Sequence, residues 1–575
     1  MLAYAATVQF AFVYDDTGQI VQNVLVQSWR FVPQYFHGQV WQYLFPNAPA
    51  NYYRPLNMLW FRVNDAMFGL HPAGWHAAAI LLHLFAVSPV YLLARRLTGR
   101  PLVAALTALF FAIHPMRHEV VAWVSGTTES LWSVLFLCAF LAYLKSRERH
   151  RVPWMAGSCL LYLAALLSKE TAIVLPGVIF AHAWLYETEP LGAIRRSMGR
   201  AAKAAQIAVI YVPVACAYLA VRVRVLHGFS HSQVHVSLRT FLLTLPSVLF
   251  FYVRQWLLPL RISEFYDLPL IVHFDARHVL FPLVGLFLLA AILWGFRRSL
   301  GSREVAFASA WMVLLLLPVL DFAVFPPGEL AHDRYFYLAS FGAALLMALA
   351  VEKLACGPNT FGFPLGLLLF TLAILAPLTY GTVGASMYWM NDYALFNHAR
   401  WIAPNNVTVR NNYAIELALR GNTATAIPLL KELLQDQPNN YLANYNYARL
   451  SYLGGDMVVA RQYFERASRL DPSSPDPYLQ LGLIDLRASR FDGAEGKIRR
   501  AIALRPEVPT YHFALAITLA DQGKCSAART EFDATLMLQP GFPRAQEQAQ
   551  KCATPATRID PPPKADAQPE AATLQ

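Results

Sequence analysis

Charged residues are scarce in this sequence. Only 14% of its 575 residues are Asp, Glu, Lys or Arg, whereas 56% are hydrophobic. Soluble domains average about 25% charged residues, so this composition excludes an ordinary soluble enzyme and predicts a membrane protein with many spanning helices. The formal net charge is +11, but the basic residues cluster in short loops between apolar segments. That is the positive-inside pattern of membrane proteins rather than a nucleic-acid patch, so we expect no nucleic-acid partner.

Cysteine is also rare. The six cysteines are residues 138, 159, 216, 356, 525 and 552. Their spacing matches no zinc-ligand pattern, and three of them lie in apolar segments. The sequence therefore predicts neither a zinc site nor a disulfide framework.

The amino terminus lacks a complete apolar span. Residues 1–14 are apolar but too short, since a spanning helix needs about 20 residues, and they have no basic stretch or cleavage site of a signal peptide. We interpret them as the end of a first spanning helix whose start is missing. Ten further apolar segments follow, at 73–94, 101–113, 129–144, 154–167, 171–186, 204–226, 279–296, 304–320, 336–352 and 363–385. The prediction is an all-α chain with about eleven spans.

The segment 240–258, TFLLTLPSVLFFYVRQWLL, is apolar too. As a further span it would move the arginine-rich loop 297–303 to the outer face, against the positive-inside rule. We therefore interpret it as a re-entrant or interfacial helix. The arginine loops then face the cytoplasm, and everything after about residue 386 lies on the outer face. The predicted location is a bacterial inner membrane, with the carboxyl-terminal third in the periplasm.

The last third of the chain repeats every 34 residues. The repeat appears in prolines, in small residues and in glycines: Pro404, Pro438, Pro472, Pro506, Pro540; Ala426, Ala460, Ala494, Ala528; Ala414, Ala448, Gly482, Ala516; Gly421, Gly455, Gly523, with Ser489 as the exception. Small residues allow two helices to approach closely and proline ends the second, which is the tetratricopeptide signature. We predict a membrane domain at 1–390, a connecting helix at 391–406, four repeats at 407–542 and a disordered Pro- and Ala-rich tail at 543–575.

Acidic residues stand at two expected outer ends of apolar segments. Asp15 and Asp16 follow the first segment directly, either as a solvated helix end or as the general base of an enzyme. Adjacent carboxylates raise each other's pKa. In HPMRHEVVAW, at 114–123, His114, His118 and Glu119 share one turn. They could form a structural salt bridge, bind a donor substrate or, less favoured because Pro115 breaks the helix, hold a divalent metal.

Three cations occupy similar positions. Arg54 lies in NYYRPLNMLWF, Lys169 precedes Glu170 in SKET, and Arg334 precedes Tyr335 in AHDRYFYLAS. Each could form a local ion pair or extend to the interface, or it could bind a phosphate. Taken with the carboxylates, they suit a substrate with a lipid tail and a phosphate. The cations would hold the phosphate leaving group while a carboxylate deprotonates an acceptor hydroxyl, which is glycosyl transfer from a lipid-phosphate sugar.

As a set, the motifs resemble one family. The DD pair, YYRPLNMLWFRVNDAMFGLHPAGWH, HPMRHEVVAW, SKET and DRYFYLAS, followed by tetratricopeptide repeats, are similar to the transmembrane and tetratricopeptide-repeat O-mannosyltransferases and their bacterial relatives. This resemblance implies the C-type glycosyltransferase fold, a polyprenyl-phosphate sugar as donor, and inverting transfer to protein hydroxyls on the extracytoplasmic side. It also implies that the Asp15–Asp16 pair supplies the catalytic base and that Glu119 fills the second acidic position. Thr127 departs from the pattern, because relatives often carry a basic residue there.

Two functional hypotheses follow. In the first, the chain is such a glycosyltransferase, with no certain cofactor. Asp15 is the favoured base because it lies nearer the membrane, and the repeats bind the acceptor or another partner protein. In the second, the chain is a non-catalytic membrane-anchored scaffold for periplasmic protein assembly, whose concave repeat face holds Asn411, Asn444, Tyr445 and Tyr478 or their neighbours. A transporter fits poorly, because the polar residues lie at span ends rather than at mid-span.

Overall fold

The computed structural model describes residues 2–43, 51–148, 151–187, 194–326, 328–354, 359–360, 363–542 and 544–552. It divides the chain into two compact units, Met1–Asn406 and Val407–Gln575. The first, which we call the membrane unit, is helical apart from one antiparallel pair of two-residue strands, β1 (Asn359–Thr360) and β2 (Phe363–Pro364). The second, which we call the repeat unit, contains only helices among its described residues.

The helices of the membrane unit are as follows: α1 Val32–Tyr35, α2 Pro55–Phe68, α3 Pro72–Thr98, α4 Pro101–Ile113, α5 His118–Val121, α6 Thr128–Ser146, α7 Arg151–Ser168, α8 Leu175–Tyr186, α9 Ile194–Ala208, α10 Val212–Leu226, α11 Leu238–Leu257, α12 Phe281–Leu300, α13 Ser302–Leu316, α14 Ser340–Leu354, α15 Leu365–Met387 and α16 Asp392–Ile402. Short 3₁₀ or π turns join them: η1 Leu2–Gln9, η2 Thr17–Val21, η3 Trp29–Phe31, η4 Pro115–Arg117, η5 Ser125–Thr127, η6 Glu170–Val174, η7 Val209–Tyr211, η8 Ala276–Leu280, η9 Leu317–Leu320, η10 Phe322–Val324 and η11 Asp333–Phe336.

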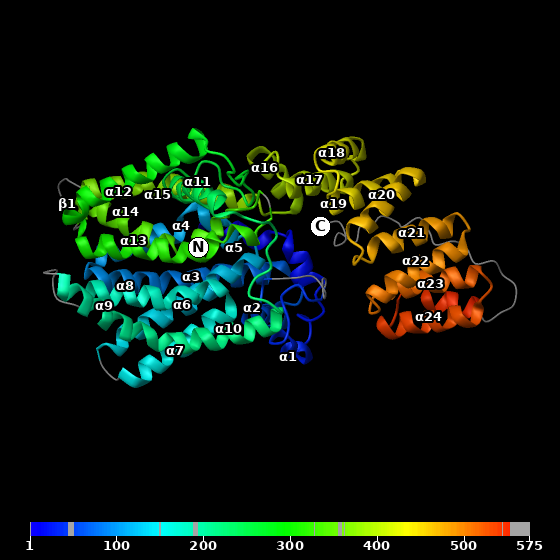
Figure 1. The fold of residues 1–575 in the computed structure, drawn as a ribbon, viewed down its shortest axis with the longest axis horizontal. Helices are drawn as coiled ribbons and strands as arrows, with labels where there is room; N and C mark the ends of the chain where they lie inside the picture. The colour runs from blue at the N-terminus through cyan, green and yellow to red at the C-terminus, as the bar shows by residue number, and fades with distance from the viewer. Residues whose placement is uncertain are drawn as a thin grey trace. The chain divides into compact units, whose positions relative to one another are not determined.

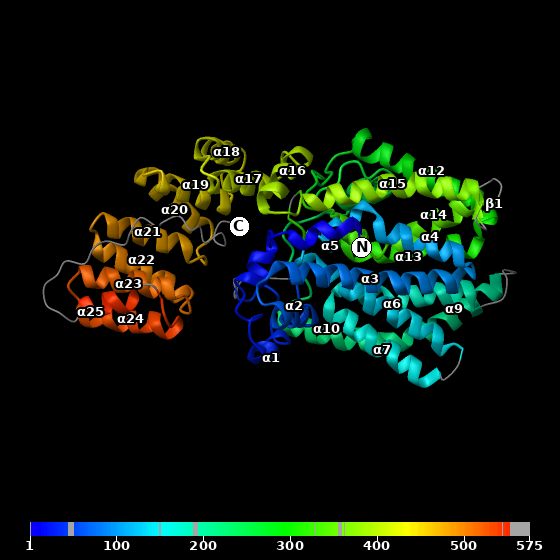
Figure 2. The same cartoon turned by 180° about the vertical axis from the view of Figure 1, so that it is seen from behind.

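Seven helical segments of the described chain are long and apolar enough to cross a membrane. They correspond to α3, α6, α7, α9–α10, α11, α12 and α13, and three shorter apolar helices lie in α4, α8 and α15. Figures 1 and 2 show α3 and α6 alongside one another. The first expected span is different, because η1 is a short 3₁₀ helix packed on α3 and α15. The number of spans, expected to be about eleven, stays a prediction.

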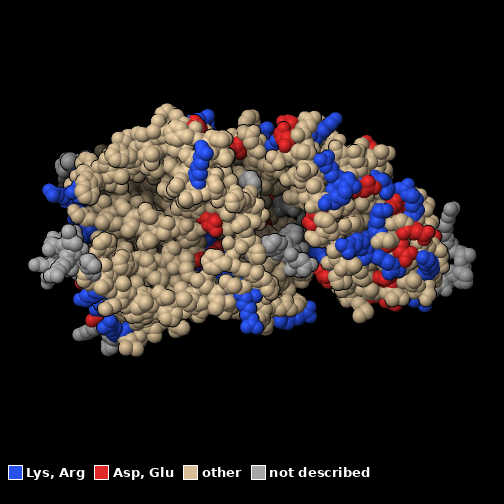
Figure 3. Space-filling model, viewed as in Figure 1, with Lys and Arg blue, Asp and Glu red and all other residues tan. Residues whose placement is uncertain are grey.

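The bundle has two chemically distinct ends. At one end, contacts join loops that the sequence analysis assigned to the outer face: Asp16 with Ser125, Asn51 with His231, Arg54 with Glu170, Lys169 with Glu129, and Arg334 with Glu119. At the other end, the arginine loops pair with acids: Arg96 with Glu148, Arg100 with Glu352, and Arg147 with Glu187. In Figure 3 the membrane unit shows a broad uncharged surface between charged edges, as expected of a membrane-spanning bundle.

Helix α11 differs from the other six long apolar segments. The loop before it is tied to the outer-end loop by hydrogen bonds between Asn51 and His231, 2.8 and 3.0 Å long. Near the other end of α11, Trp256 stacks on His114 with 4.0 Å between ring centroids. Both ends of α11 therefore contact the same end of the bundle. This arrangement fits the interfacial helix expected for 240–258, although length and composition alone would also allow α11 to span.

The repeat unit contains four helix pairs and one further helix: α17 Val407–Leu419, α18 Thr423–Asp436, α19 Tyr441–Leu453, α20 Met457–Leu470, α21 Asp476–Arg487, α22 Phe491–Leu504, α23 Pro509–Asp521, α24 Cys525–Leu538 and α25 Ala545–Lys551. The periodic alanines at 426, 460, 494 and 528 are fully buried, as expected where paired helices cross. Residues 545–551 form α25, so the disordered tail predicted from residue 543 begins too early. Its residues 543 and 553–575 lie outside the described residues.

The turns between paired helices use a left-handed backbone. Gly421, Gly455 and Gly523 have φ of 81°, 89° and 77°, and Ser489 adopts the same region with φ of 56°. Glycine occupies this region without a Cβ penalty, so Ser489 is the strained member of the series.

The residues proposed for the concave face do not all reach the surface. Asn411, Asn444 and Tyr445 are buried. The Nδ2 of Asn444 donates to the carbonyl oxygens of Pro438 and Asn440, and Tyr445 packs edge-on against Phe464. Asn411, Asn444 and Tyr445 therefore stabilise the repeats. The prediction that these three residues lie on an exposed concave face is wrong.

Candidate active site

The acidic pair follows a strained residue. Tyr14 has φ of 57°, a conformation that bulky side chains rarely adopt outside functional sites. The N–H of Tyr14 donates to Oδ1 of Asp392 at 2.7 Å, and its ring contacts Trp123, Phe265 and Phe396. These contacts hold the turn in place, and the two acids that follow have different environments.

Asp16 is fully enclosed. Its Oδ1 accepts hydrogen bonds from the backbone N–H and the hydroxyl of Ser125, at 2.7 and 2.6 Å, and its Oδ2 accepts from the N–H of Val13 at 3.1 Å. Burial raises the pKa of Asp16 to about 7, and these hydrogen bonds oppose the rise. With three donors in place, this carboxylate joins the first loop to η5. It is suited to positioning rather than to receiving a proton.

Asp15 is only half-buried and therefore reachable. Gln19 donates to its Oδ2 at 3.3 Å. Burial raises the pKa of Asp15 to about 7, the charge of Arg334 opposes this, and Glu264 and Asp16 reinforce it. A carboxylate with a pKa near the working pH is an effective general base. The structure thus gives the two acids of the pair different roles, and Asp15 is the one that can exchange a proton with a substrate.

Arg334 lies between two buried glutamates. Its Nη1 donates to Oε2 of Glu119 at 2.8 Å and to Oε1 of Glu264 at 2.5 Å. Glu119 also accepts from the backbone N–H groups of Asp333 and Arg334, at 2.9 and 3.3 Å, so it fixes the turn that carries Arg334. Burial and the charge of Glu264 raise the pKa of Glu119, whereas the charges of Arg334 and His332 lower that of Glu264 to about 2.

The other two cations of the site are Lys169 and Arg54, and the ring of Tyr335 connects Lys169 to Arg334. The ring of Tyr335 lies 5.0 Å from the guanidinium carbon of Arg334 and 5.1 Å from Nζ of Lys169. Lys169 pairs with the buried Glu129. Arg54 pairs with Glu170 through Nε and Nη2, at 3.0 and 2.5 Å. The three predicted phosphate-binding cations therefore each have a glutamate partner, and a phosphate would share or replace these partners.

His114 lies apart from this cluster. Its Nε2 contacts the carbonyl oxygen of Trp256 at 2.9 Å, and its Nδ1 accepts from the N–H of Met116 at 3.3 Å. Both ring nitrogens are thus occupied and the side chain is fully buried. We expected His114 to bind substrate, and this environment instead anchors α11, so we omit it from the site.

Among the residues that the structure describes, two groups of side chains have metal-ligand chemistry. His118, Glu119 and Asp333 form one and Glu119, Glu264 and His332 the other, with ligand atoms within 4.8 Å of one another. The Nδ1 of His118 accepts from Nε1 of Trp389 at 2.8 Å. Its Nε2 therefore carries the proton and faces Asp333 at 3.3 Å. Since Arg334 already donates to both glutamates, a cation bound here would have to replace existing donors, and a metal stays the less favoured expectation.

Sequence reasoning missed Glu264 and Asp392. Both stand in stretches without a recognisable motif, and each reaches the site through a contact with a residue more than 60 positions away, Arg334 for Glu264 and Tyr14 for Asp392. Only the fold reveals them. Thr127, the departure from the family pattern, is buried, and its hydroxyl donates to the carbonyl of Val124 at 2.6 Å.

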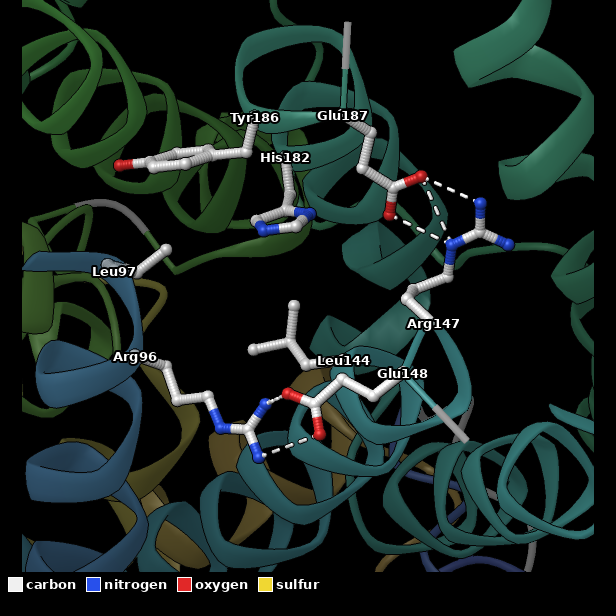
Figure 4. Close-up of a pocket in the computed structure, with 8 residues that line it drawn as sticks. All are labelled: Arg96, Leu97, Leu144, Arg147, Glu148, His182, Tyr186 and Glu187. Carbon is white, nitrogen blue, oxygen red and sulfur yellow. Dashed lines mark hydrogen bonds and ion pairs between the residues drawn. The ribbon is translucent and has the colours of Figure 1, made fainter. Parts of the chain in front are cut away.

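A pocket of about 380 Å³ lies at the other end of the bundle. Figure 4 shows two ion pairs in its lining, Arg96 with Glu148 and Arg147 with Glu187. Arg147 follows the last residue of α6, whereas Glu129 lies in its first turn. A 19-residue helix is about 28 Å long, so this pocket is separate from the acidic pair.

Comparison with known proteins supports both units. The tetratricopeptide repeat family profile matches residues 414–475 and 479–545. Over 549 residues the chain is 26% identical to "Protein O-mannosyl-transferase TMTC3" of Mus musculus, covering 86% of this chain and 58% of that protein. It is 27% identical over 507 residues to "Protein O-mannosyl-transferase TMTC1" of Homo sapiens, covering 78% and 55%. The chain therefore spans a little more than half of the length of these relatives.

Two similar solved structures each match about a quarter of the chain. "Crystal structure of MamA protein" has a TM-score of 0.24 with 22% identity, over 25% of this chain and 80% of that one. "Crystal structure of YrrB: a TPR protein with an unusual peptide-binding site" has a TM-score of 0.25 with 20% identity, over 27% and 81%. The sequence relatives, by contrast, match most of the chain, so they confirm the resemblance that the motifs indicated.

Proposed function

We propose that this chain, a homologue of the transmembrane and tetratricopeptide-repeat O-mannosyltransferases, is an integral membrane glycosyltransferase. It transfers mannose or a similar sugar from a polyprenyl-phosphate donor to a Ser or Thr hydroxyl of an exported protein. The observation that carries the proposal is Asp15, a half-exposed carboxylate with a pKa raised to about 7. It stands at the end of the bundle where a row of cations converges.

Asp15 acts as the general base in this mechanism. It takes the proton of the acceptor hydroxyl as the hydroxyl oxygen attacks the anomeric carbon of the sugar. The bond from that carbon to the phosphate oxygen breaks, and the lipid phosphate leaves with the electron pair. Because a single displacement needs one base and no covalent enzyme intermediate, it inverts the anomeric centre.

Arg334, Lys169 and Arg54 stabilise the charge that develops on the leaving phosphate. In the described part of the chain, Arg334 contacts both of its glutamates through Nη1, so its guanidinium can offer its other N–H groups to a phosphate. Glu119 and Glu264 orient that guanidinium, and Asp16 holds the turn that presents Asp15. The lipid tail of the donor would lie in the bilayer beside the bundle.

The reaction takes place on the extracytoplasmic side in this proposal. The arginine loops lie at the end of the bundle opposite to Asp15, and the positive-inside rule assigns those loops to the cytoplasm. The repeats follow the last apolar helix and, with an odd number of spans, share the side of Asp15. For a bacterial inner membrane this is the periplasm.

The repeats bind the acceptor or a partner protein. A groove of about 450 Å³ lies between α20 and α21, with an apolar lining that includes Met457 and Ile484 and a rim that includes Arg461, Arg487 and Arg490. Glu465 is the acid in that lining. Arg461 and Arg490 are paired with Asp485, so the charges of the lining are nearly balanced. The apolar lining therefore favours a partner segment with apolar side chains.

A non-catalytic scaffold for periplasmic assembly is the second candidate. It accounts for the repeats and their groove. It gives no reason for Asp15 to be partly exposed within reach of the charge of Arg334 at one end of the bundle.

Glycoproteomics of the exported proteins tests the enzyme against the scaffold. A deletion strain would be complemented with the wild type, with Asp15→Asn, or with Asp321→Asn. Asp321 is an exposed acid of another outer loop, so it is the matched control. We expect a hexose-modified peptide that disappears on deletion and returns with the wild type and Asp321→Asn only. Restoration by Asp15→Asn would overturn the catalytic assignment.

A further inference from the structure

Two of the cysteines meet at the end of the repeat unit. Cys525 is the first residue of α24, and Cys552 directly follows α25. Their Sγ atoms are 2.6 Å apart. The sequence analysis expected no disulfide framework. The fold brings these two thiols together by returning the end of α25 to the start of α24.

The hairpin formed by α24 and α25 explains this approach. The chain turns at Gly541, where φ is 86°, and α25 then packs back along α24. Disulfides require two Cβ atoms within about 4.5 Å and an S–S bond of about 2.0 Å. Two sulfur atoms in contact at the end of an antiparallel hairpin need only a small movement to form that bond.

We propose that Cys525 and Cys552 are oxidised to a disulfide that fastens α25 to the last repeat. The proposal rests on the extracytoplasmic location proposed above, since disulfides persist in oxidising compartments. The two thiols lose two protons and two electrons as the S–S bond forms. The electrons reduce the disulfide of a thiol oxidoreductase, or glutathione disulfide, to two thiols.

The bond has a structural purpose. Helix α25 has seven residues, too few to be stable alone, and its buried face consists of Ala545 and Gln548. That face lies on an apolar cluster to which Phe513 and Phe532 belong. Stacked repeats need a terminal helix to shield their last apolar surface. A disulfide keeps this short helix docked by limiting the freedom of the unfolded segment.

Two of the other described cysteines supply a matched control. Cys138 and Cys159 lie in the apolar helices α6 and α7, and all five described cysteines are free thiols in the structure. A Cys138→Ser/Cys159→Ser variant therefore removes two thiols while leaving the proposed pair intact. A Cys525→Ser/Cys552→Ser variant removes the pair by the same chemistry.

Peptide mapping of the full chain tests the proposal. Protein taken from membranes is alkylated before denaturation, digested without reductant and analysed by mass spectrometry. We expect one cross-linked peptide that joins Cys525 to Cys552, present in the wild type and the control variant and absent after dithiothreitol. We also expect the midpoint of thermal unfolding of the repeats to fall by about 5–10 °C on reduction in these two proteins. Cys525→Ser/Cys552→Ser should show the lower midpoint with or without reductant.

Two results would overturn the proposal in different ways. If both thiols are alkylated in protein from membranes but link when glutathione disulfide is added, the pairing geometry is right and the repeats lie in a reducing compartment. That result would also contradict the extracytoplasmic location. If the thiols fail to link even with glutathione disulfide, the pairing itself is wrong, and the glycosyltransferase proposal is untouched.

Discussion

Asp15 in the membrane unit and Asp485 in the repeat unit show two ways of enclosing an acid. Asp485 is 2% exposed and accepts hydrogen bonds from Arg461, Arg490 and Lys497, which lower its pKa to about 2 against the opposing effect of burial. Asp15 shares the charge of Arg334 with Glu119 and Glu264, and its pKa is raised to about 7. Several cations around one carboxylate lower its pKa and keep it ionised as a structural anion. One cation shared by several carboxylates leaves the pKa raised, and the acid can then exchange a proton at neutral pH.

Removing the charge of Asp15 should have the largest effect. Loss of a general base reduces turnover by about 10²–10⁴-fold, so Asp15→Asn should lower the rate of sugar transfer by at least about a hundredfold. The measurement is transfer of radiolabelled mannose from a polyprenyl-phosphate donor in isolated membranes. Asp321→Asn should remain fully active. If Asp15→Asn keeps wild-type activity, Asp15 is not the general base, and the difference in pKa between Asp15 and Asp485 does not identify a catalytic acid.

The pH dependence of transfer should follow Asp15. Because the base must be ionised and its pKa is about 7, activity should fall about tenfold per pH unit below pH 7. The raised pKa means that the folded protein binds a proton more tightly than the unfolded chain. The contribution of Asp15 therefore favours folding at low pH and is lost as the pH rises from about 4 to 7. A rate that stays constant between pH 5 and 8 would show that another group sets the protonation step.

Asp485→Asn should destabilise the repeats without affecting the chemistry. The substitution leaves three cations around a neutral amide, with an expected loss of about 2 kcal/mol, since none of those cations is buried. The wild-type contribution of Asp485 is present above about pH 4 and is lost as the pH falls toward 2. Thermal unfolding followed by circular dichroism measures the loss, with the exposed Asp533→Asn as control. An equal loss of stability in Asp485→Asn and Asp533→Asn would show that the ion pairs of Asp485 with the three cations do not stabilise the repeats.

Ser489→Gly should have the smallest effect, and it should be stabilising. Ser489 adopts the left-handed conformation that glycine adopts in the other repeats, so glycine should raise the free energy of unfolding by about 0.5–1 kcal/mol. Gly523→Ser provides the reciprocal comparison and should lower the stability by a similar amount. Denaturant melts of both variants test this, and a loss of stability in Ser489→Gly would mean that the serine side chain has a stabilising contact.

Part of the site could be predicted from the sequence. Asp15, Asp16, Glu119, Lys169 and Arg334 were proposed because each follows or precedes an apolar segment, and the ends of such segments lie at membrane surfaces. The structure brings all five to one end of the bundle. The same reasoning misplaced His114, since a position at a helix end does not reveal whether the side chain points to substrate or, as here, stacks on Trp256.

The sequence by itself determined the features that depend on neighbouring residues. The apolar segments, the basic loops and the 34-residue period of the repeats all reflect helix length, helix contact and turn geometry within a few tens of residues. Only the tertiary structure decided which of the two acids is held by Ser125 and which is accessible. It also decided that Glu264 shares Arg334 and that Cys525 meets Cys552. These pairings join positions separated by 27 to 109 residues, where the fold and not the local pattern sets the distance.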